Sequence, residues 1–108
     1  MNAQLNGQVA LVTGASRGIG QAIATALATS GAQVIGTATS AAGAERISEH
    51  LSTAGLSARG VTLDVTNSEQ TTEVLADISA NEGTPSILVN NAGITRDNLA
   101  MRMSDDDW

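Results

Sequence analysis

The order of apolar and polar residues along the chain predicts short buried strands that alternate with amphipathic helices. Gln8–Thr13 is an almost continuous apolar run that ends at a glycine, as expected for a strand buried on both faces of a parallel sheet. From Gly18 the apolar positions take helical spacing, and Gly31 is a favourable residue just beyond the end of this helix. Its expected apolar stripe is Ile19, Ile23, Ala26 and Leu27.

The same alternation continues along the chain. A second strand is predicted over Gln33–Ala38, and Ser40 is placed to cap the helix that follows. A third strand is predicted over Gly60–Asp64, and Thr66 has capping-box spacing with Glu69 at the start of a third helix. The apolar stripes of these two helices are expected at Ala44, Ile47, Leu51 and Ala54, and at Val74, Leu75 and Ile78.

A fourth strand is predicted over Ser86–Asn90, which gives the order β-α-β-α-β-α-β. Strands that alternate with helices in this way form a parallel sheet with right-handed crossovers and helices on both faces. The pattern therefore predicts an α/β fold, with one domain over residues 1–108.

Composition narrows the partners and the compartment. The chain carries 5 basic and 11 acidic residues and a net charge of -6, which argues against nucleic acid or an anionic membrane as the main partner. It has no cysteine, and hence neither a disulfide framework nor a thiolate metal site. The segment Met1–Gln8 is too polar for a signal peptide, and no apolar run approaches the roughly 18 residues of a membrane span, so we expect a cytoplasmic protein.

Two residue types that many enzymes use are missing. The sequence has no tyrosine and no lysine. Tyrosine general-acid chemistry, Schiff-base chemistry and a P-loop lysine are therefore excluded within these residues. The single histidine, His50, has no partner placed for catalysis and is expected to be a solvated side chain on the second helix.

A glycine-rich loop lies between the first strand and the first helix, in the sequence TGASRGIG. Such a loop alone is commonly only a turn, but in this context it is a dinucleotide-binding fingerprint. Gly14 permits the tight turn, Gly18 lets the backbone approach a pyrophosphate, and Gly20 lets the helix pack closely on the sheet. We therefore expect a nucleotide cofactor at this loop.

The end of the second strand indicates which cofactor is preferred. An NAD-selective site usually places an acid there against the ribose hydroxyls, whereas Thr37–Ser40 contains none. Without that repulsion a 2′-phosphate is tolerated, and Arg17 offers it a charge-assisted hydrogen bond. The interpretation is NADP(H) rather than NAD(H), with Arg17 as a plain solvated charge as the alternative.

Two further strand ends carry polar residues. Asp64 and Val65 follow the third strand, where a carboxylate could accept from an adenine amino group or could only shape a turn. Asn90–Gly93 follows the fourth strand, where short amides and a glycine could line a ligand crevice or form an ordinary loop.

Together, Thr13–Gly20 and Asn90–Gly93 resemble the two motifs of the short-chain dehydrogenase/reductase family. The resemblance extends from Leu5 to Trp108, and Gly93–Met103 is most similar to the bacterial 3-oxoacyl-(acyl-carrier-protein) reductases. It implies a Rossmann-type doubly wound parallel sheet, of which this chain would hold the first four strands and three helices. It also implies NADPH-dependent reduction of a β-ketoacyl thioester carried on acyl carrier protein, and a homotetramer for the complete protein.

The resemblance also assigns residues to the cofactor. Thr39 would lie near the 2′-phosphate, Asp64 and Val65 at the adenine, and Asn91 at the nicotinamide-side ribose. The complete expected set is Gly14, Ala15, Ser16, Arg17, Gly18, Ile19, Gly20, Thr39, Asp64, Val65, Asn91, Ala92 and Gly93.

The family's catalytic Ser, Tyr, Lys and second Asn have no counterpart in these 108 residues. The interpretation is a cofactor-binding half that is inactive alone, with no catalytic and no metal-binding residue. Ser104–Asp107 has the composition of a helix start, so the sequence is expected to be cut before the catalytic segment, although an exposed acidic tail is an alternative.

Two alternatives to the reductase interpretation stay open. The chain could be a non-catalytic module that sequesters NADP(H) or joins full-length subunits. It could also come from another member of the family that acts on a sugar, a steroid or a polyol.

Overall fold

The computed structural model describes residues 5–16, 18–64 and 66–91. Within them, strands and helices alternate as the pattern predicts, and the α/β order is confirmed. The elements are β1 (Val9–Val12), α1 (Gly18–Thr29), β2 (Gln33–Ala38), α2 (Ala41–Thr53), β3 (Ala58–Thr62), α3 (Ser68–Asn81) and β4 (Ile87–Val89).

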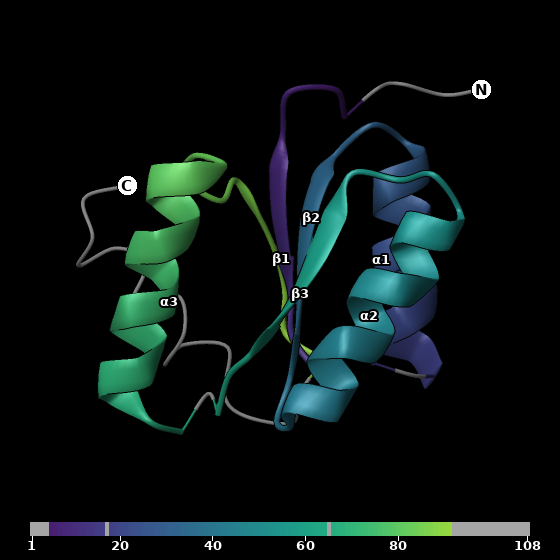
Figure 1. The fold of residues 1–108 in the computed structure, drawn as a ribbon. Coiled ribbons are helices and arrows are strands. Elements are labelled where there is room, and N and C mark those ends of the chain that lie inside the picture. The colour runs from purple at the N-terminus through teal and green to yellow at the C-terminus, as the bar shows by residue number, and fades with distance from the viewer. Residues whose placement is uncertain (1–4, 17, 65, 92–108) are drawn as a thin grey trace.

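The four strands form one parallel sheet in the order β3-β2-β1-β4. The chain starts at β1, extends through β2 to β3, and then returns to the other side of β1 with β4. Figure 1 shows α1 and α2 on one face of the sheet and α3 on the other. This arrangement confirms the doubly wound, Rossmann-type prediction and puts the change of direction between β1 and β4.

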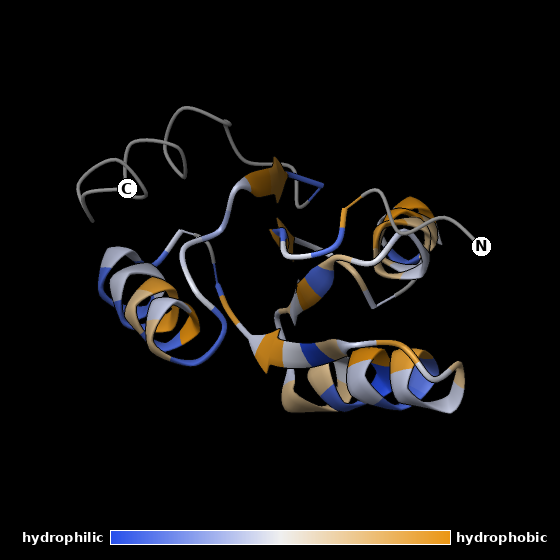
Figure 2. Ribbon diagram, turned by 90° about the horizontal axis from the view of Figure 1, so that it is seen from above, coloured by the Kyte–Doolittle hydropathy of each residue, from blue (hydrophilic) through white to orange (hydrophobic). Residues whose placement is uncertain are grey.

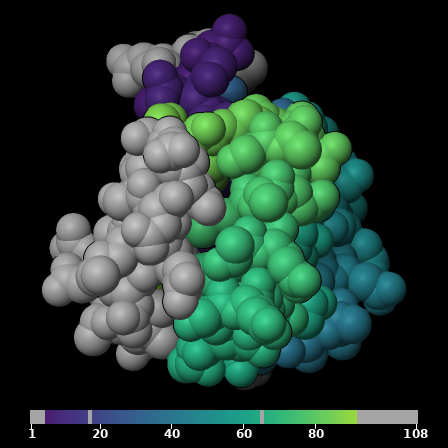
Figure 3. Space-filling model, turned by 90° about the vertical axis from the view of Figure 1, so that its left-hand side faces the viewer, coloured from purple at the N-terminus to yellow at the C-terminus, as the bar shows by residue number. Residues whose placement is uncertain are grey.

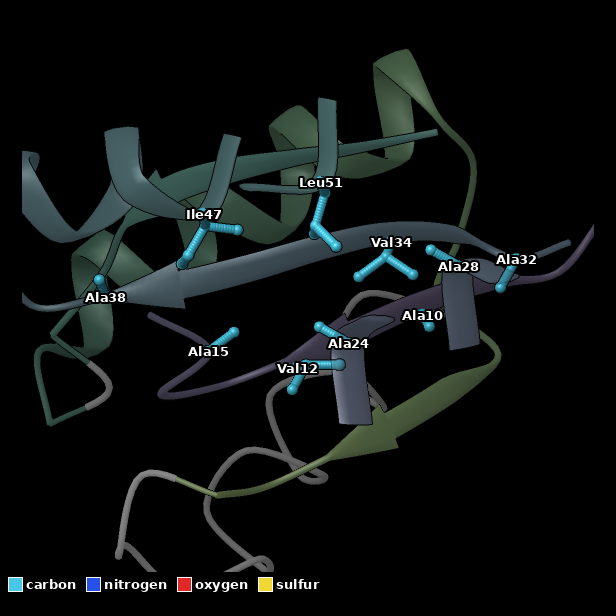
Figure 4. Close-up of a cluster of buried hydrophobic side chains, with 10 residues drawn as sticks. All are labelled: Ala10, Val12, Ala15, Ala24, Ala28, Ala32, Val34, Ala38, Ile47 and Leu51. Atoms are coloured by element: carbon cyan, nitrogen blue, oxygen red, sulfur yellow. The ribbon is translucent and has the colours of Figure 1, made fainter. Parts of the chain in front are cut away.

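Alternating side chains of β1 build the two halves of the core. Ala10 and Val12 belong to the cluster with α1 and α2, whereas Val9 and Leu11 belong to the cluster with α3. Because successive residues of a strand point to opposite faces, both faces of this central strand are buried. In Figure 2 the apolar sides of α2 and α3 face the sheet, and in Figure 4 the first cluster fills the space between α1, α2 and the strands.

The apolar stripe predicted for α1 is wrong in part, because Ile19 and Ala26 are exposed while Leu27 packs against the core. The buried residues of this helix are Gly20, Ala24 and Ala28, while Ile19 is 73% exposed. The smallest residues face the sheet because they let the helix approach the backbone, and the larger side chains lie at the flanks. Side-chain size, rather than hydrophobicity, decides which face of this helix is buried.

The start of α2 is confirmed, and the start of α3 needs a correction. The Gly43 N–H donates to Ser40 Oγ at 3.0 Å, as predicted for the cap of α2. At α3 the cap is Asn67, whose Oδ1 accepts from the Gln70 N–H, and not Thr66. The Thr66 hydroxyl instead donates to Asp64 Oδ1 at 2.6 Å, which gives this residue a different partner.

The bounds of three strands also differ from the prediction, and the first of them, β1, covers only Val9–Val12 of the predicted Gln8–Thr13. β3 covers Ala58–Thr62, two residues earlier than the predicted Gly60–Asp64, and β4 covers only Ile87–Val89. The shift of β3 follows from its pairing, in which Val34 lies opposite Ala58. Asp64 therefore lies beyond the end of β3 rather than within it.

An ion cluster joins the edge strand β3 to α3. Arg59 Nε donates to Glu82 Oε2 at 2.6 Å, and Arg59 Nη2 donates to Asp77 Oδ2 at 2.8 Å. The hydrogen bond with Glu82 raises the pKa of Arg59, so the guanidinium stays charged. Figure 3 shows the side of the molecule on which α3 lies, with this helix at the surface.

Candidate functional site

The loops that follow β1 and β4 meet where the chain changes direction. Open parallel sheets bind ligands outside the carboxyl ends of their strands, at the point where the strand order reverses. Here β1 leads into the glycine-rich loop, and β4 leads into Asn90 and Asn91. The fold therefore brings two of the sequence motifs together at the carboxyl edge of the sheet.

The glycine-rich loop is fixed to β2 at one point. Gly14 has a φ of 63°, which only glycine adopts readily, and this turn takes the chain off β1. The next residue, Ala15, is buried, and its N–H donates to the Thr37 carbonyl of β2 at 2.9 Å. Gly36 makes room for it, because a Cβ at Gly36 would lie 2.9 Å from Ala15 Cβ.

Gly20 sets how closely α1 approaches this loop. A Cβ at Gly20 would lie 2.1 Å from the Gly14 carbonyl oxygen and 2.6 Å from Asn91 Nδ2. Real Cβ atoms do not make such contacts, so no other residue fits here without moving the helix. The role expected for Gly20, close packing of the helix, has direct support in the geometry.

Gly18 faces open space above the loop. Its φ is 64°, and a Cβ at this position would meet no atom within 4 Å. Gly18 is also the first residue of α1, where the N–H groups of the first turn have no partner within the helix and the helix dipole favours an anion. The backbone thus leaves room for a pyrophosphate beside N–H donors, which fits the dinucleotide predicted from the sequence.

The buried Thr13 joins the ends of β1 and β4. The Asn91 N–H donates to Thr13 Oγ1 at 2.8 Å, and the Thr13 N–H donates to the Val89 carbonyl at 3.0 Å. Asn91 Nδ2 in turn donates to the Gly14 carbonyl at 3.1 Å. Asn91 therefore spans both motifs, and its backbone and side chain are both held in place.

Asp64 lies beyond β3, at the far side of the same edge. Its Oδ1 accepts from the Thr66 hydroxyl at 2.6 Å and from the Thr66 N–H at 3.0 Å. These two hydrogen bonds lower the pKa of Asp64, with the hydroxyl as the larger cause. Asp64 thus shapes a turn, which was the alternative prediction for it. Its carboxylate is exposed, so a ligand could also reach it.

The remaining predicted residues divide into two groups. Ser16, Ile19 and Thr39 belong to the loop, the start of α1 and the end of β2, and Ile19 and Thr39 are exposed. Arg17, Val65, Ala92 and Gly93 lie outside the described residues, as does the predicted helix start at Ser104–Asp107.

Three residues that hold the candidate site in place were not singled out from the sequence, namely Thr13, Gly36 and Gln70. Thr13 could have been found as the only polar residue at the end of a buried run, whereas nothing in the pattern singles out Gly36. Gln70 is the third, because its Oε1 accepts from the Asp64 N–H at 2.6 Å. The pattern did not reveal this contact, because Gln70 lies in the first turn of α3, six residues along the chain from its partner.

The described residues do not favour a histidine site, a metal site or a membrane-spanning helix. His50 Nε2 lies 3.4 Å from Thr25 Oγ1 on the exposed side of α2, next to an open hollow of about 600 Å³. Among the described side chains, no three acidic, histidine or cysteine groups converge on a possible metal position. No helix in this part of the chain combines the length and apolar character needed to cross a membrane.

Comparisons with known proteins match this chain to short-chain dehydrogenases and reductases. A family model described as short chain dehydrogenase matches residues 8–108. The chain is 60% identical over 104 residues to the 3-oxoacyl-(acyl-carrier-protein) reductase FabG of Pseudomonas aeruginosa, which covers 96% of this chain and 42% of the relative. It is 58% identical over 102 residues to the protein of that name from Escherichia coli, which covers 94% of this chain and 41% of the relative.

A solved structure agrees in its fold. The crystal structure of 2-keto-3-deoxy-D-gluconate dehydrogenase from Streptococcus agalactiae superposes with a TM-score of 0.79 and 40% sequence identity. The match covers 88% of this chain and 36% of that protein. This chain therefore spans well under half the length of the relatives that it matches.

Proposed function

Because the chain belongs to the short-chain dehydrogenase family, we propose that it is the cofactor-binding part of an NADPH-dependent 3-oxoacyl-(acyl-carrier-protein) reductase. The observation that carries this proposal is the 60% identity to such a reductase over nearly the whole chain. The complete protein would reduce a β-ketoacyl thioester on acyl carrier protein to the 3-hydroxyacyl thioester. The carrier protein and a homotetramer are proposed as partners of that complete protein.

The described residues would hold the cofactor along the carboxyl edge of the sheet. Gly14 and Gly18 would bring backbone and first-turn N–H groups to the pyrophosphate, and Asn91, held by its hydrogen bond to the Gly14 carbonyl, would contact the nicotinamide-side ribose. The exposed Asp64 would contact the adenine. When bound, the nicotinamide supplies the hydride, and this chain's residues bind and orient it.

The preference for NADP(H) over NAD(H) is part of the proposal. Its support is the absence of an acid at the end of β2, where Thr39 is exposed and Ser40 uses its side chain to cap α2. The proposed positive partner of the 2′-phosphate is Arg17. A charge-assisted hydrogen bond of this kind corresponds to about tenfold to a hundredfold in affinity.

Fluorescence titration of the 108-residue chain with NADPH and NADH tests this binding. We expect tighter binding of NADPH, and we expect Arg17→Ala to raise the Kd for NADPH by about tenfold or more while leaving the Kd for NADH nearly unchanged. Arg46→Ala is the matched control, because Arg46 is an exposed arginine on α2. Equal Kd values for Arg17→Ala and the wild type would contradict the assignment.

We further propose that these residues alone turn over no substrate. The sequence contains no tyrosine and no lysine, so it lacks the proton donor and the amine that the family's chemistry uses. The experiment is to mix the chain with NADPH and a β-ketoacyl thioester and to follow absorbance of the reduced nicotinamide. Binding without oxidation is the expected result, and sustained oxidation would contradict it.

The structural similarity to a sugar-acid dehydrogenase favours a second candidate. The complete protein could then oxidise or reduce a different carbonyl or alcohol. Assays of the complete protein on a β-ketoacyl thioester and on 2-keto-3-deoxy-D-gluconate would separate the two. The higher identity to the acyl-carrier-protein reductases is the reason for placing that function first.

A further inference from the structure

The first turn of α3 holds Asp64 by a closed set of hydrogen bonds. The Asp64 carbonyl accepts from the Asn67 N–H at 2.9 Å, and the Asp64 N–H donates to Gln70 Oε1 at 2.6 Å. Asn67 Oδ1 in turn accepts from the Gln70 N–H at 3.0 Å. Both backbone polar groups of Asp64 are therefore fixed to the same helical turn.

The carboxylate is held as well as the backbone. Thr66 directs its hydroxyl and its N–H to the same oxygen, Asp64 Oδ1. Among the described residues no group donates to Oδ2, and the residue is exposed at the edge of the sheet. One oxygen thus serves as an internal anchor, and the other is presented outward as an acceptor.

This arrangement exceeds what an ordinary turn requires. A turn needs the bond between the Asp64 side chain and the Thr66 N–H, whereas the additional bonds from the Thr66 hydroxyl and to Gln70 fix the side chain and the backbone independently. An exposed carboxylate without such restraints would rotate among several rotamers, and ordering it on binding would lower the affinity.

From this geometry we propose that Thr66 and Gln70 are positioning residues that preorganise Asp64 to accept the exocyclic amino group of the cofactor's adenine. The inference rests on the proposed function, because it needs a dinucleotide at this edge. Gln70 fixes the position of the Asp64 backbone, and Thr66 fixes the rotamer of its carboxylate. Neither residue needs to touch the cofactor.

The experiment measures base discrimination rather than binding alone. The 108-residue chain is titrated with NADPH and with reduced nicotinamide hypoxanthine dinucleotide phosphate, in which a carbonyl replaces the adenine amino group. For the wild type we expect about tenfold tighter binding of NADPH, because the carboxylate accepts from the amino group and repels the carbonyl. Asp64→Asn should remove or reverse this preference, since a carboxamide can donate to the carbonyl.

The two positioning residues are then changed one at a time. Thr66→Ala removes the hydroxyl and keeps the N–H, and Gln70→Met keeps the length of the side chain and removes the acceptor. We expect each to lower the preference for NADPH about threefold to tenfold, with nearly unchanged binding of the hypoxanthine cofactor. Thr66→Ser should restore the wild-type preference.

Thr72→Ala is the matched control, because the Thr72 hydroxyl donates only to the Ser68 carbonyl within α3. If Thr66→Ala and Gln70→Met weaken both cofactors equally, their role is merely structural and the inference is wrong. If the wild type binds both cofactors equally well, Asp64 does not recognise the amino group, and the inference fails while the proposed function stands. If the wild type binds neither cofactor, the proposed function fails and this inference fails with it.

Discussion

The two faces of the sheet are packed by side chains of different size. On the face of α1 and α2, six of the ten buried residues in the cluster are alanines, whereas the cluster on the face of α3 consists of Val9, Leu11, Ile35, Leu75 and Ile78. On the first face the helices come so close that their backbones meet the loop and strand backbones. On the second, larger side chains fill a wider space, and an ion cluster joins the edge strand to the helix.

This difference bears on the proposed cofactor site. The close face carries the glycine-rich loop, and the approach of α1 brings its first-turn N–H groups to the carboxyl edge of the sheet. A larger side chain at the contact would move the helix and its N–H groups together. The α3 face has no such constraint, so there the usual preference for large apolar side chains applies.

The largest expected effect is at Gly60, where α2 crosses β3. A Cβ at this position would lie 2.1 Å from the Ala44 carbonyl oxygen and 2.9 Å from Ile47 Cβ, and no rotamer change can relieve a clash with backbone. We expect Gly60→Ala to lower the free energy of unfolding by about 3 kcal/mol or more, as measured by urea denaturation.

Gly55→Ala is the control for this substitution. Gly55 has a φ of 76° and no atom within 4 Å of its potential Cβ, so only backbone strain opposes the change. Its expected cost is about 1 kcal/mol. Equal losses at the two glycines would show that the close approach of α2 to β3 does not limit residue size.

The α3 face should be destabilised by a smaller side chain, and the face of α1 and α2 by a larger one. On the α3 face, Ile78→Ala leaves a cavity at a fully buried position and should cost about 3 kcal/mol. On the other face, Ala24→Leu overpacks the contact of α1 with the sheet and should cost about 2 kcal/mol. Denaturation midpoints check both, and tolerance of leucine at Ala24 would contradict the comparison.

The ion cluster makes a smaller contribution, and only on the α3 face. Arg59→Met removes the charge and leaves the Glu82 carboxylate, 10% exposed, without its partner, so we expect a loss of about 1 to 2 kcal/mol that decreases with added salt. The raised pKa of Arg59 gives stability that is present below the unfolded-state pKa and lost only as the pH rises through the folded one. The difference in the free energy of unfolding between Arg59→Met and the wild type should therefore be constant from about pH 6 to pH 9. A double-mutant cycle with Glu82→Gln measures the coupling energy between Arg59 and Glu82. A coupling energy of zero would show that this ion pair does not stabilise the α3 face.

Local patterns predict some features of this fold, whereas others depend on tertiary contacts. The order of elements, the bounds of β2, the cap at Ser40 and the loop between β1 and α1 follow from local patterns, because turn and cap chemistry acts over a few residues. The buried face of α1 could not be found by hydrophobicity, since Gly20 and Ala24 are buried for their size and the more hydrophobic Ile19 is exposed. That choice depends on how near the sheet lies, which is a property of the tertiary fold.

The candidate site shows the same division between local and tertiary information. Gly14 was predicted to permit a tight turn and Gly20 to allow close packing of the helix, and the geometry at both agrees, whereas the role of Gly18 toward a pyrophosphate stays a prediction. The contributions of Thr13 and Gln70 depend on partners in other elements or on a helix boundary that the pattern misplaced. Thr66 illustrates the reason, because its spacing to Glu69 fits a capping box and yet its hydroxyl binds Asp64.

The smallest expected effect should be the same on both faces. Ser40 caps α2 and Asn67 caps α3 through equivalent hydrogen bonds of 3.0 Å, from the Gly43 and Gln70 N–H groups respectively. We expect Ser40→Ala and Asn67→Ala each to cost about 1 kcal/mol in urea denaturation, because a cap satisfies one backbone donor whatever packs against the helix. A cost at Asn67 well above that at Ser40 would indicate that Asn67 also supports the hydrogen-bonded turn around Asp64, and base discrimination measured on Asn67→Ala would then separate the two roles. Equal costs would instead show that helix capping is local in both layers, and that the faces differ only where side-chain size decides how closely helix and sheet can approach.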